Sequence, residues 1–203
     1  MRGHPLLLVP ALAVLTCSVL AGCTPAGTPG GARRAATSPP RPAASGRPGS
    51  PTNPLALSCA EESFPGYPDP PVPPRARPAD LAIGPLIIVN GKRLATADPA
   101  GYGQHGTYKI PLVVLPGRVV TVTIAAPARE WVAIDNPYAH LRGVSDVTAA
   151  TYRSCPHATG FFAQGFAFSG GRVRGCVPLE VRIGGEPRVR HVTLSLFAGS
   201  CPS

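Results

Sequence analysis

Thiol and imidazole groups are the side chains of this chain best suited to hold a metal ion. Cys155-Pro156-His157 places a thiol two residues before an imidazole, and further imidazoles follow from His105, His140 and His191. A blue-copper site combines two histidines and a cysteine, usually with an axial methionine. The sole methionine is Met1. We therefore expect no metal site, and we expect Cys155 to form a disulfide.

A second candidate chemistry is nucleophilic. The segment Ala167-Phe168-Ser169-Gly170-Gly171 resembles the A-x-S-x-G form of the lipase nucleophile elbow, and His191 follows it along the chain. That elbow needs a helix directly after the serine, but residues 172–176 (RVRGC) make a poor helix start. We interpret Ser169 as a hairpin residue. An esterase-like envelope hydrolase that uses Ser169 and His191 remains the alternative function.

A glycine-rich segment, residues 101–106 (GYGQHG), matches the G-x-G-x-x-G pattern of dinucleotide sites. Such a site needs a strand before the glycines and a helix after them, so that the helix N-terminus holds the pyrophosphate. Here a strand-like run follows instead. The segment is interpreted as a loop, and no cofactor is expected.

The cysteines beyond the N-terminal leader number four. An even number in an exported domain predicts two disulfides, and three pairings are possible. We favour Cys155 with Cys176, which would tie the ends of a phenylalanine-rich hairpin. Cys59 with Cys201 would then join the start of the domain to its last strand.

The N-terminal residues have features that predict an export signal. Arg2 precedes a largely apolar stretch, residues 6–19, which is too short for a membrane span and has the length of a signal-peptide core. Leu20-Ala21-Gly22-Cys23 then resembles the lipobox of bacterial lipoproteins. The resemblance implies a signal peptide over 1–22 and lipidation of Cys23. It also implies a lipid-anchored protein at the outer face of the cytoplasmic membrane, because two or three acyl chains anchor stably. An ordinary secretory signal is the alternative.

Composition separates a tether from a folded domain. Residues 23–55 are rich in Pro, Gly, Ala and Arg, which predicts a disordered tether. The basic residues of the tether could contact anionic lipid, or they could be solvated. The net charge of the chain is +9, yet its basic residues are dispersed in sequence and not interleaved with aromatic residues. We therefore expect no nucleic-acid partner.

Residues 56–203 are predicted to form an all-β, antiparallel β-sandwich of about eight strands, with a proline-rich extended segment over 62–79. Period-two hydrophobic patterning, broken by Gly and Pro turns, supports this fold. Asn90-Gly91 is a hairpin signal, and the phenylalanines near residue 165 are interpreted as core. The strands are expected at Leu86–Val89, Tyr108–Leu115, Val119–Ala125, Glu130–Ile134, Asp146–Arg153, Gly160–Phe168, Val177–Ile183 and His191–Phe197.

These features favour a non-enzymatic binding module at the cell envelope. The chain's layout resembles small actinobacterial lipoproteins of unknown function. Loops on a rigid β scaffold usually carry function, so the loops over 95–107 and 136–144 are the expected contact surfaces, with an envelope polymer or another protein as the partner. Their candidate binding residues are Tyr102, His105, Tyr138, His140 and Arg142.

Overall fold

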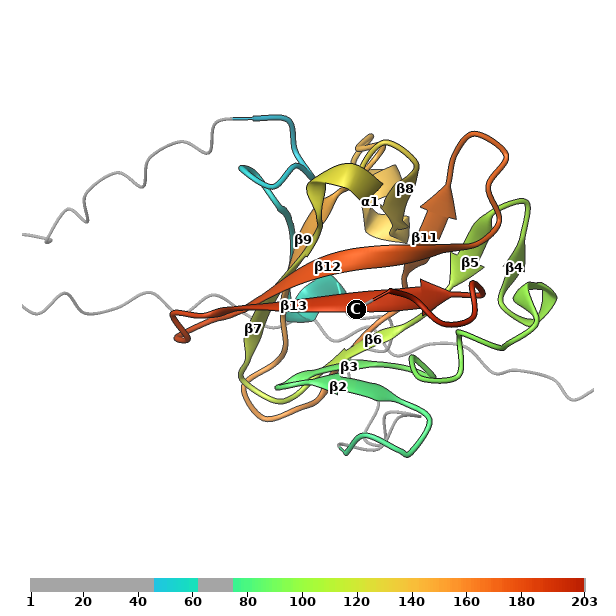
Figure 1. Cartoon of the computed structure of the whole chain (residues 1–203). Coiled ribbons are helices and arrows are strands. Elements are labelled where there is room, and N and C mark those ends of the chain that lie inside the picture. Colours follow the sequence, from blue (N-terminus) through green and yellow to red (C-terminus); the bar gives the residue numbers. More distant parts are fainter. Residues whose placement is uncertain (1–45, 62–74, 203) are drawn as a thin grey trace, which may run out of the picture. The chain divides into compact units, whose positions relative to one another are not determined.

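The computed structural model describes residues 46–61 and 75–202, and Figure 1 shows them as an all-β fold. The predicted signal peptide, Cys23, tether residues 23–45 and residues 62–74 of the proline-rich segment lie outside the described residues. The prediction of an all-β, sandwich-like domain is confirmed. Within the described part, the helical elements are a short α-helix, α1 (Pro137–Leu141), and three 3₁₀ turns at Cys59–Glu61, Pro99–Gly101 and Ala126–Ala128.

The largest sheet has five strands in the order β1-β9-β7-β12-β13. Its pairings are antiparallel except that of β1 with β9, which is parallel. Along β7, Val120, Val122 and Ile124 are buried and the alternating residues are half-buried, which confirms the predicted period of two. The strands are β1 (Leu55–Leu57), β9 (Ala149–Arg153), β7 (Val119–Ile124), β12 (Gly175–Ile183) and β13 (Val189–Leu196).

Two four-stranded sheets complete the fold, in the orders β10-β6-β3-β2 and β4-β5-β11-β8. All of their pairings are antiparallel. The first contains β10 (Gly160–Phe162), β6 (Leu112–Val114), β3 (Leu86–Ile88) and β2 (Leu81–Ile83). The second contains β4 (Gly103–Gln104), β5 (Thr107–Lys109), β11 (Gly165–Phe168) and β8 (Val132–Asp135).

One hydrophobic core joins the three sheets. It includes Val122 from the five-stranded sheet, Leu86 from the second and Phe166 from the third, all at most 2 % exposed. Burying a side chain of this size contributes about 1.5–3 kcal/mol. The interpretation of the phenylalanine-rich segment as core is confirmed for Phe162 and Phe166, and the Phe162 ring packs edge-on against Tyr152.

The sequence predicted fewer and longer strands than the thirteen found in the described residues. The expected strand over 108–115 breaks at Ile110-Pro111, where the chain passes from β5 in one sheet to β6 in another. Proline has no backbone N–H to continue a ladder. The strand expected over 160–168 breaks at Gln164, whose carbonyl accepts from the Ile110 N–H at 2.8 Å. Asn90-Gly91 forms a turn, but β3 instead forms its hairpin with β2, through Gly84.

The domain begins earlier than predicted. Residues 46–55 were expected to belong to the tether, but Gly49 is buried and its carbonyl accepts from the N–H groups of Thr148 and Ala149 at 2.7 and 2.8 Å. The boundary at residue 55 is therefore wrong. Turn-like composition at 46–53 was mistaken for disorder, although these residues supply backbone partners to the start of β9.

The prediction of two disulfides is confirmed, but the predicted pairing is wrong. Cys59 pairs with Cys155, and Cys176 pairs with Cys201. Parallel pairing of Leu57 with Tyr152 carries Cys59 alongside Cys155, with 4.9 Å between their Cα atoms. Strand β7 lies between β9 and β12 and so separates Cys155 from Cys176.

Candidate ligand site

A row of three residues crosses the sheet β4-β5-β11-β8 near one of its ends. Lys109 on β5 and Asp135 on β8 are both register partners of Gly165 on β11. The two charged residues are thus two strands apart, about 10 Å between Cα atoms. No ion pair joins them in the described part of the chain. Gly165 is required because a Cβ there would lie 1.6 Å from the Tyr108 carbonyl oxygen.

Gln164 lies next to this row and is only 4 % exposed. Its side-chain Oε1 accepts from the Tyr152 hydroxyl, and burial raises the pKa of Tyr152, so that hydroxyl stays protonated and donates. The Nε2 amide nitrogen of Gln164 is buried and has no hydrogen-bond partner in the structure. An unmade hydrogen bond of this kind costs about 1–3 kcal/mol. The Gln164 amide therefore has two N–H donors without an acceptor in the described part of the chain.

A cavity of about 190 Å³ opens beside these residues. Drug-sized ligands occupy cavities of roughly 300–1,000 Å³, so this one suits a small molecule or one group of a larger ligand. Its walls are mostly apolar, with a lysine, a carboxylate and an amide among them. The lining residues are Lys109, Pro111, Asp135, Pro137, Phe161, Ala163 and Gln164.

Helix α1 shapes one side of the cavity. Asn136 caps this helix by accepting from the Tyr138 N–H at 2.9 Å, and Pro137 occupies its first position. The turn brings His140 back to Asp135, with 2.8 Å between Nε2 and Oδ1. The His140 side chain is 66 % exposed and that of Asp135 is 25 % exposed. The imidazole therefore orients the carboxylate at the rim of the cavity.

The five predicted binding residues do not form one surface. His105 lies at the β4–β5 turn, beyond Thr107, whereas α1 follows Asp135 at the other end of the sheet and along its opposite edge. Tyr102 is half-buried, with its ring 5.4 Å from that of Phe197. Of the five, His140 is the one whose side chain hydrogen-bonds a side chain of the cavity lining in the described structure. Tyr102 reaches the lining only through its backbone, since its carbonyl oxygen accepts from the Lys109 N–H at 2.9 Å.

Arg142 and Tyr138 have structural contacts. Arg142 donates to the Ala56 carbonyl oxygen at 2.8 Å and pairs with the Glu61 carboxylate, tying the end of α1 to β1 and the turn after it. Hydrogen bonds from Ser58, together with Arg142, hold the pKa of Glu61 below its usual value. Tyr138 is half-buried against the main core. Both side chains therefore make contacts that stabilise the fold.

The residues of the alternative hydrolase do not meet. The Ser169 hydroxyl donates to the Glu130 carbonyl oxygen at 3.3 Å, and the serine lies in the turn between β11 and β12 with no helix after it. Ser169 lines a cavity of about 300 Å³, whereas His191 lines another of about 570 Å³. A nucleophile and its base need hydrogen-bond contact, and none joins this pair in the described part of the chain.

The other sequence motifs have structural roles. Cys155 is in a disulfide, and among residues 46–61 and 75–202 no group of three His, Cys, Asp or Glu side chains is placed to hold a metal. The G-x-G-x-x-G segment forms a small hairpin between β4 and β5, in which His105 and Gly106 adopt positive φ. These two φ values are those of a type I′ turn.

Lys109, Asp135 and Gln164 were not identified from the sequence. The charged pair is brought together by strand register, which single-sequence patterns do not contain. Gln164 did carry a signal: it is the one polar side chain in the run Phe161–Phe168 (FFAQGFAF). A polar residue within such a run is buried and needs partners.

Comparison of the chain with protein-family models, with curated proteins and with solved structures finds no match in any of the three. Within the described residues, no helix has the length and apolar character needed to cross a membrane.

Proposed function

We propose that the protein is a non-enzymatic binding module of the cell envelope, lipid-anchored at Cys23, which binds a small acceptor-bearing ligand in the cavity beside Gln164. The order of the N-terminal signal features and Leu20-Ala21-Gly22-Cys23 supports the anchor. The two disulfides suit an oxidising compartment. The proposed location is the outer face of the cytoplasmic membrane.

The observation that carries the ligand site is the unpartnered amide of Gln164. Gln164 lines the cavity, and we propose that a ligand acceptor takes up its buried N–H groups together with the Lys109 ammonium. The matching ligand group is then a carboxylate or an amide carbonyl. The apolar walls would hold a small apolar part beside that acceptor. The carboxylate of Asp135 could in turn accept a ligand N–H or O–H.

Acetate and acetamide are suitable probes, because they present the charged and the neutral acceptor on one methyl group. The chain from residue 24 onward retains all described residues and lacks Cys23. We expect acetate to shift the side-chain amide NMR signals of Gln164 saturably. Gln104 is exposed and is the only other glutamine, so its signals are the internal reference.

The matched variants are Lys109→Met and Lys92→Met, since the chain has two lysines and both are exposed. Lys109→Met should weaken acetate binding about tenfold or more, as expected for loss of a charge-assisted hydrogen bond. Lys92→Met should leave the affinity unchanged. Equal effects of the two substitutions, or Gln164 signals that respond to neither probe, would rule out this site.

The anchor has its own test. Cys23→Ala should move the protein from the membrane fraction to the soluble exported fraction, or leave its signal peptide uncleaved. Normal processing and membrane retention of this variant would refute lipidation at Cys23.

An esterase assay tests the hydrolase alternative. If the protein is a binding module, the purified protein should not hydrolyse p-nitrophenyl acetate above the uncatalysed rate. An esterase activity that disappears with Ser169→Ala would instead show that the protein is an enzyme.

A further inference from the structure

Four arginines from three separate stretches of the sequence lie at one end of the five-stranded sheet. Strand register places Arg153 of β9 opposite Val119, the neighbour of Arg118. Arg182 of β12 lies opposite Val189, the neighbour of Arg188. Strands β9, β7, β12 and β13 are adjacent in the sheet. We call Arg118, Arg153, Arg182 and Arg188 the basic end.

The strands present this charge in a defined direction. Residues directly paired across antiparallel strands point to the same face of a sheet. Arg153 pairs with Val119 and Arg182 pairs with Thr121, and both β7 residues face away from the buried Val120 and Val122. The guanidinium groups of Arg153 and Arg182 therefore project from the outer face of the sheet.

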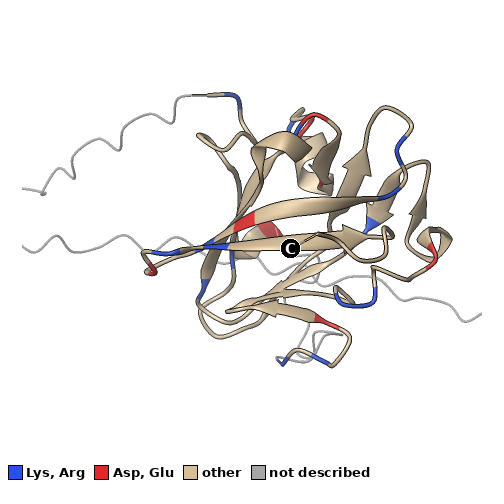
Figure 2. Cartoon of the chain, in the orientation of Figure 1, with Lys and Arg blue, Asp and Glu red and all other residues tan. Residues whose placement is uncertain are grey.

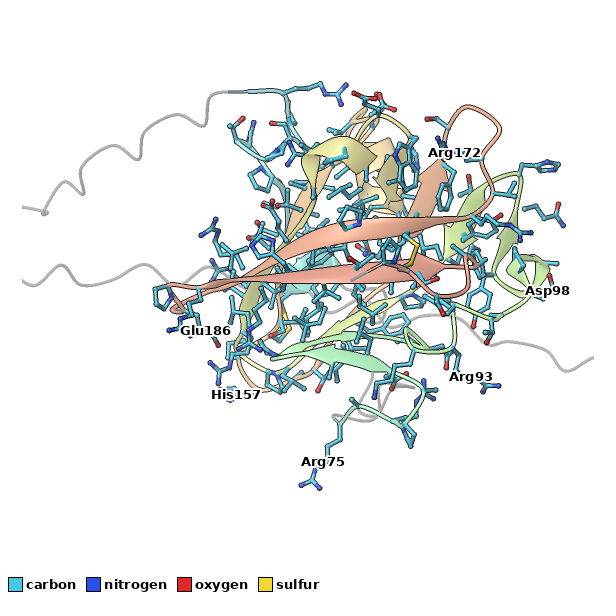
Figure 3. All side chains as sticks on the ribbon, viewed as in Figure 1. Arg75, Arg93, Asp98, His157, Arg172 and Glu186 are labelled. Atoms are coloured by element: carbon cyan, nitrogen blue, oxygen red, sulfur yellow. A yellow bond between two sulfur atoms is a disulfide. The ribbon has the colours of Figure 1, made fainter. Side chains whose placement is uncertain are left out.

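The charges of the basic end are not neutralised within the described part of the chain. All four arginines are exposed, and none of their guanidinium groups has an ion pair or a hydrogen bond there. The nearby acid Glu186 is already paired with Arg190 at 2.9 Å. Figure 2 shows the blue segments of this end on the left, and Figure 3 shows Glu186 and His157 projecting there.

We propose that the basic end docks the domain onto the anionic phosphate headgroups of the membrane that carries the lipid anchor. Guanidinium groups bind phosphate oxygens through paired hydrogen bonds, and basic side chains are attracted to anionic lipid surfaces. The exposed, unpaired arginines lie on β9 and β12 or directly before β7 and β13, and so present a surface rather than a pocket. Such a surface matches a layer of headgroups.

Chain length supports this choice of partner. Only 22 residues, 24–45, separate Cys23 from the first described residue, Gly46. Even when fully extended, they reach about 80 Å at most. The proposed anchor would thus keep the basic end at a high effective concentration near the headgroups. This effective-concentration argument rests on the proposed lipid anchor, whereas the observation of the charged surface is independent of the anchor.

Vesicle binding of the chain from residue 24 tests the proposal without the lipid. We expect the protein to co-sediment with vesicles of phosphatidylcholine and phosphatidylglycerol, more strongly at low salt, and not with phosphatidylcholine alone. Changing Arg118, Arg153, Arg182 and Arg188 together to Gln should weaken binding by at least about tenfold, given the contribution of each basic residue near such a surface.

The control removes four positive charges elsewhere, by changing the exposed Arg75, Lys92, Arg93 and Arg174 to Gln. It should bind vesicles as the parent does, and replacing the basic end with Lys should largely restore binding. Equal losses in the two Gln variants would overturn the proposal, because net charge alone would then explain binding. Binding to a soluble poly(glycerol phosphate) but not to anionic vesicles would also overturn it. Because the vesicle assay uses unlipidated protein, its outcome is independent of the Cys23→Ala test.

Discussion

Two of the buried polar side chains, Asp80 and Gln164, lie in different regions of the molecule, and their hydrogen bonding differs. Asp80 is fully buried, and its carboxylate accepts from the backbone N–H groups of Arg77 and Asn90, both at 2.8 Å, and from the Arg77 guanidinium at 3.2 Å. Gln164 uses its amide oxygen but not its amide nitrogen. Groups of its own turn satisfy the Asp80 carboxylate, whereas the Gln164 amide has two N–H groups without an acceptor in the described part of the chain.

Substitution of Asp80 is expected to have the largest effect on stability. Asp80→Ala removes a buried charged acceptor and takes this partner from the backbone N–H groups of Arg77 and Asn90, so it should lower the free energy of unfolding by about 3 kcal/mol. Urea denaturation measures this. Asp98→Ala is the matched control, because Asp98 also caps a turn, accepting from the Ala100 N–H at 3.0 Å, but in an exposed position. It should cost about 1 kcal/mol or less.

The same carboxylate predicts a pH dependence of stability. Burial raises the pKa of Asp80, but the hydrogen bonds from Asn90 and Arg77, together with the Arg77 charge, outweigh burial and hold the pKa below its ordinary value. A lowered folded-state pKa stabilises the fold above the unfolded value of about 3.9. That stability is lost as pH falls through the folded pKa.

We therefore expect the difference in unfolding free energy between the parent and Asp80→Asn to be largest near neutral pH. It should shrink as pH drops below about 4. Denaturation curves at several pH values would reveal this trend. A difference that is constant from pH 7 to pH 2.5 would contradict the assigned role of the charge.

A smaller effect is expected at Gln164. Gln164→Met should cost about 1–2 kcal/mol, because the buried Tyr152 hydroxyl loses its acceptor. Combining it with Tyr152→Phe removes both partners, so the double variant should be about as stable as the parent or slightly more stable. A double-mutant cycle by chemical denaturation measures the coupling. If the losses in unfolding free energy of the two single variants add up in the double variant, the pair is not coupled. The comparison between Gln164 and Asp80 would then not hold.

The smallest expected effects on stability are at the charged residues of the cavity. Lys109→Met and Asp135→Asn should each change the free energy of unfolding by no more than about 0.5 kcal/mol, since neither residue is fully buried. Their effects on acetate binding should be opposite. Lys109→Met should weaken it, and Asp135→Asn should strengthen it by removing a like charge. Losses of stability above 1 kcal/mol at either residue would indicate a structural role instead.

Patterns of period two predicted the fold class well. The strands β7, β12 and β13 were predicted correctly from local sequence. The breaks at Pro111 and Gln164 were missed because apolar residues continue across them while the backbone changes sheets. Helix α1 was missed because five residues are too few to show a helical period, although Asn136-Pro137 is a recognisable start.

The candidate site was beyond single-sequence reasoning for a related reason. Lys109 and Asp135 are 26 positions apart, and only their shared register with Gly165 brings them to one cavity. The basic end was hidden in the same way, because its arginines appear dispersed when read along the chain. The wrong disulfide pairing followed from assuming hairpin neighbours where the parallel β1–β9 pair determines which cysteines meet.

That parallel pair also sets the order in which the domain can be completed. Strand β1 and Cys59 need β9 and Cys155, which follow 96 positions later. At synthesis rates of about 5–20 residues per second, the first strand waits roughly 5–20 s for its partner to be made. Contacts so distant in sequence form slowly. The N-terminal part of the domain is therefore still unclosed while most of the chain is being made, which is the condition a polypeptide needs if it is to be threaded through an export channel.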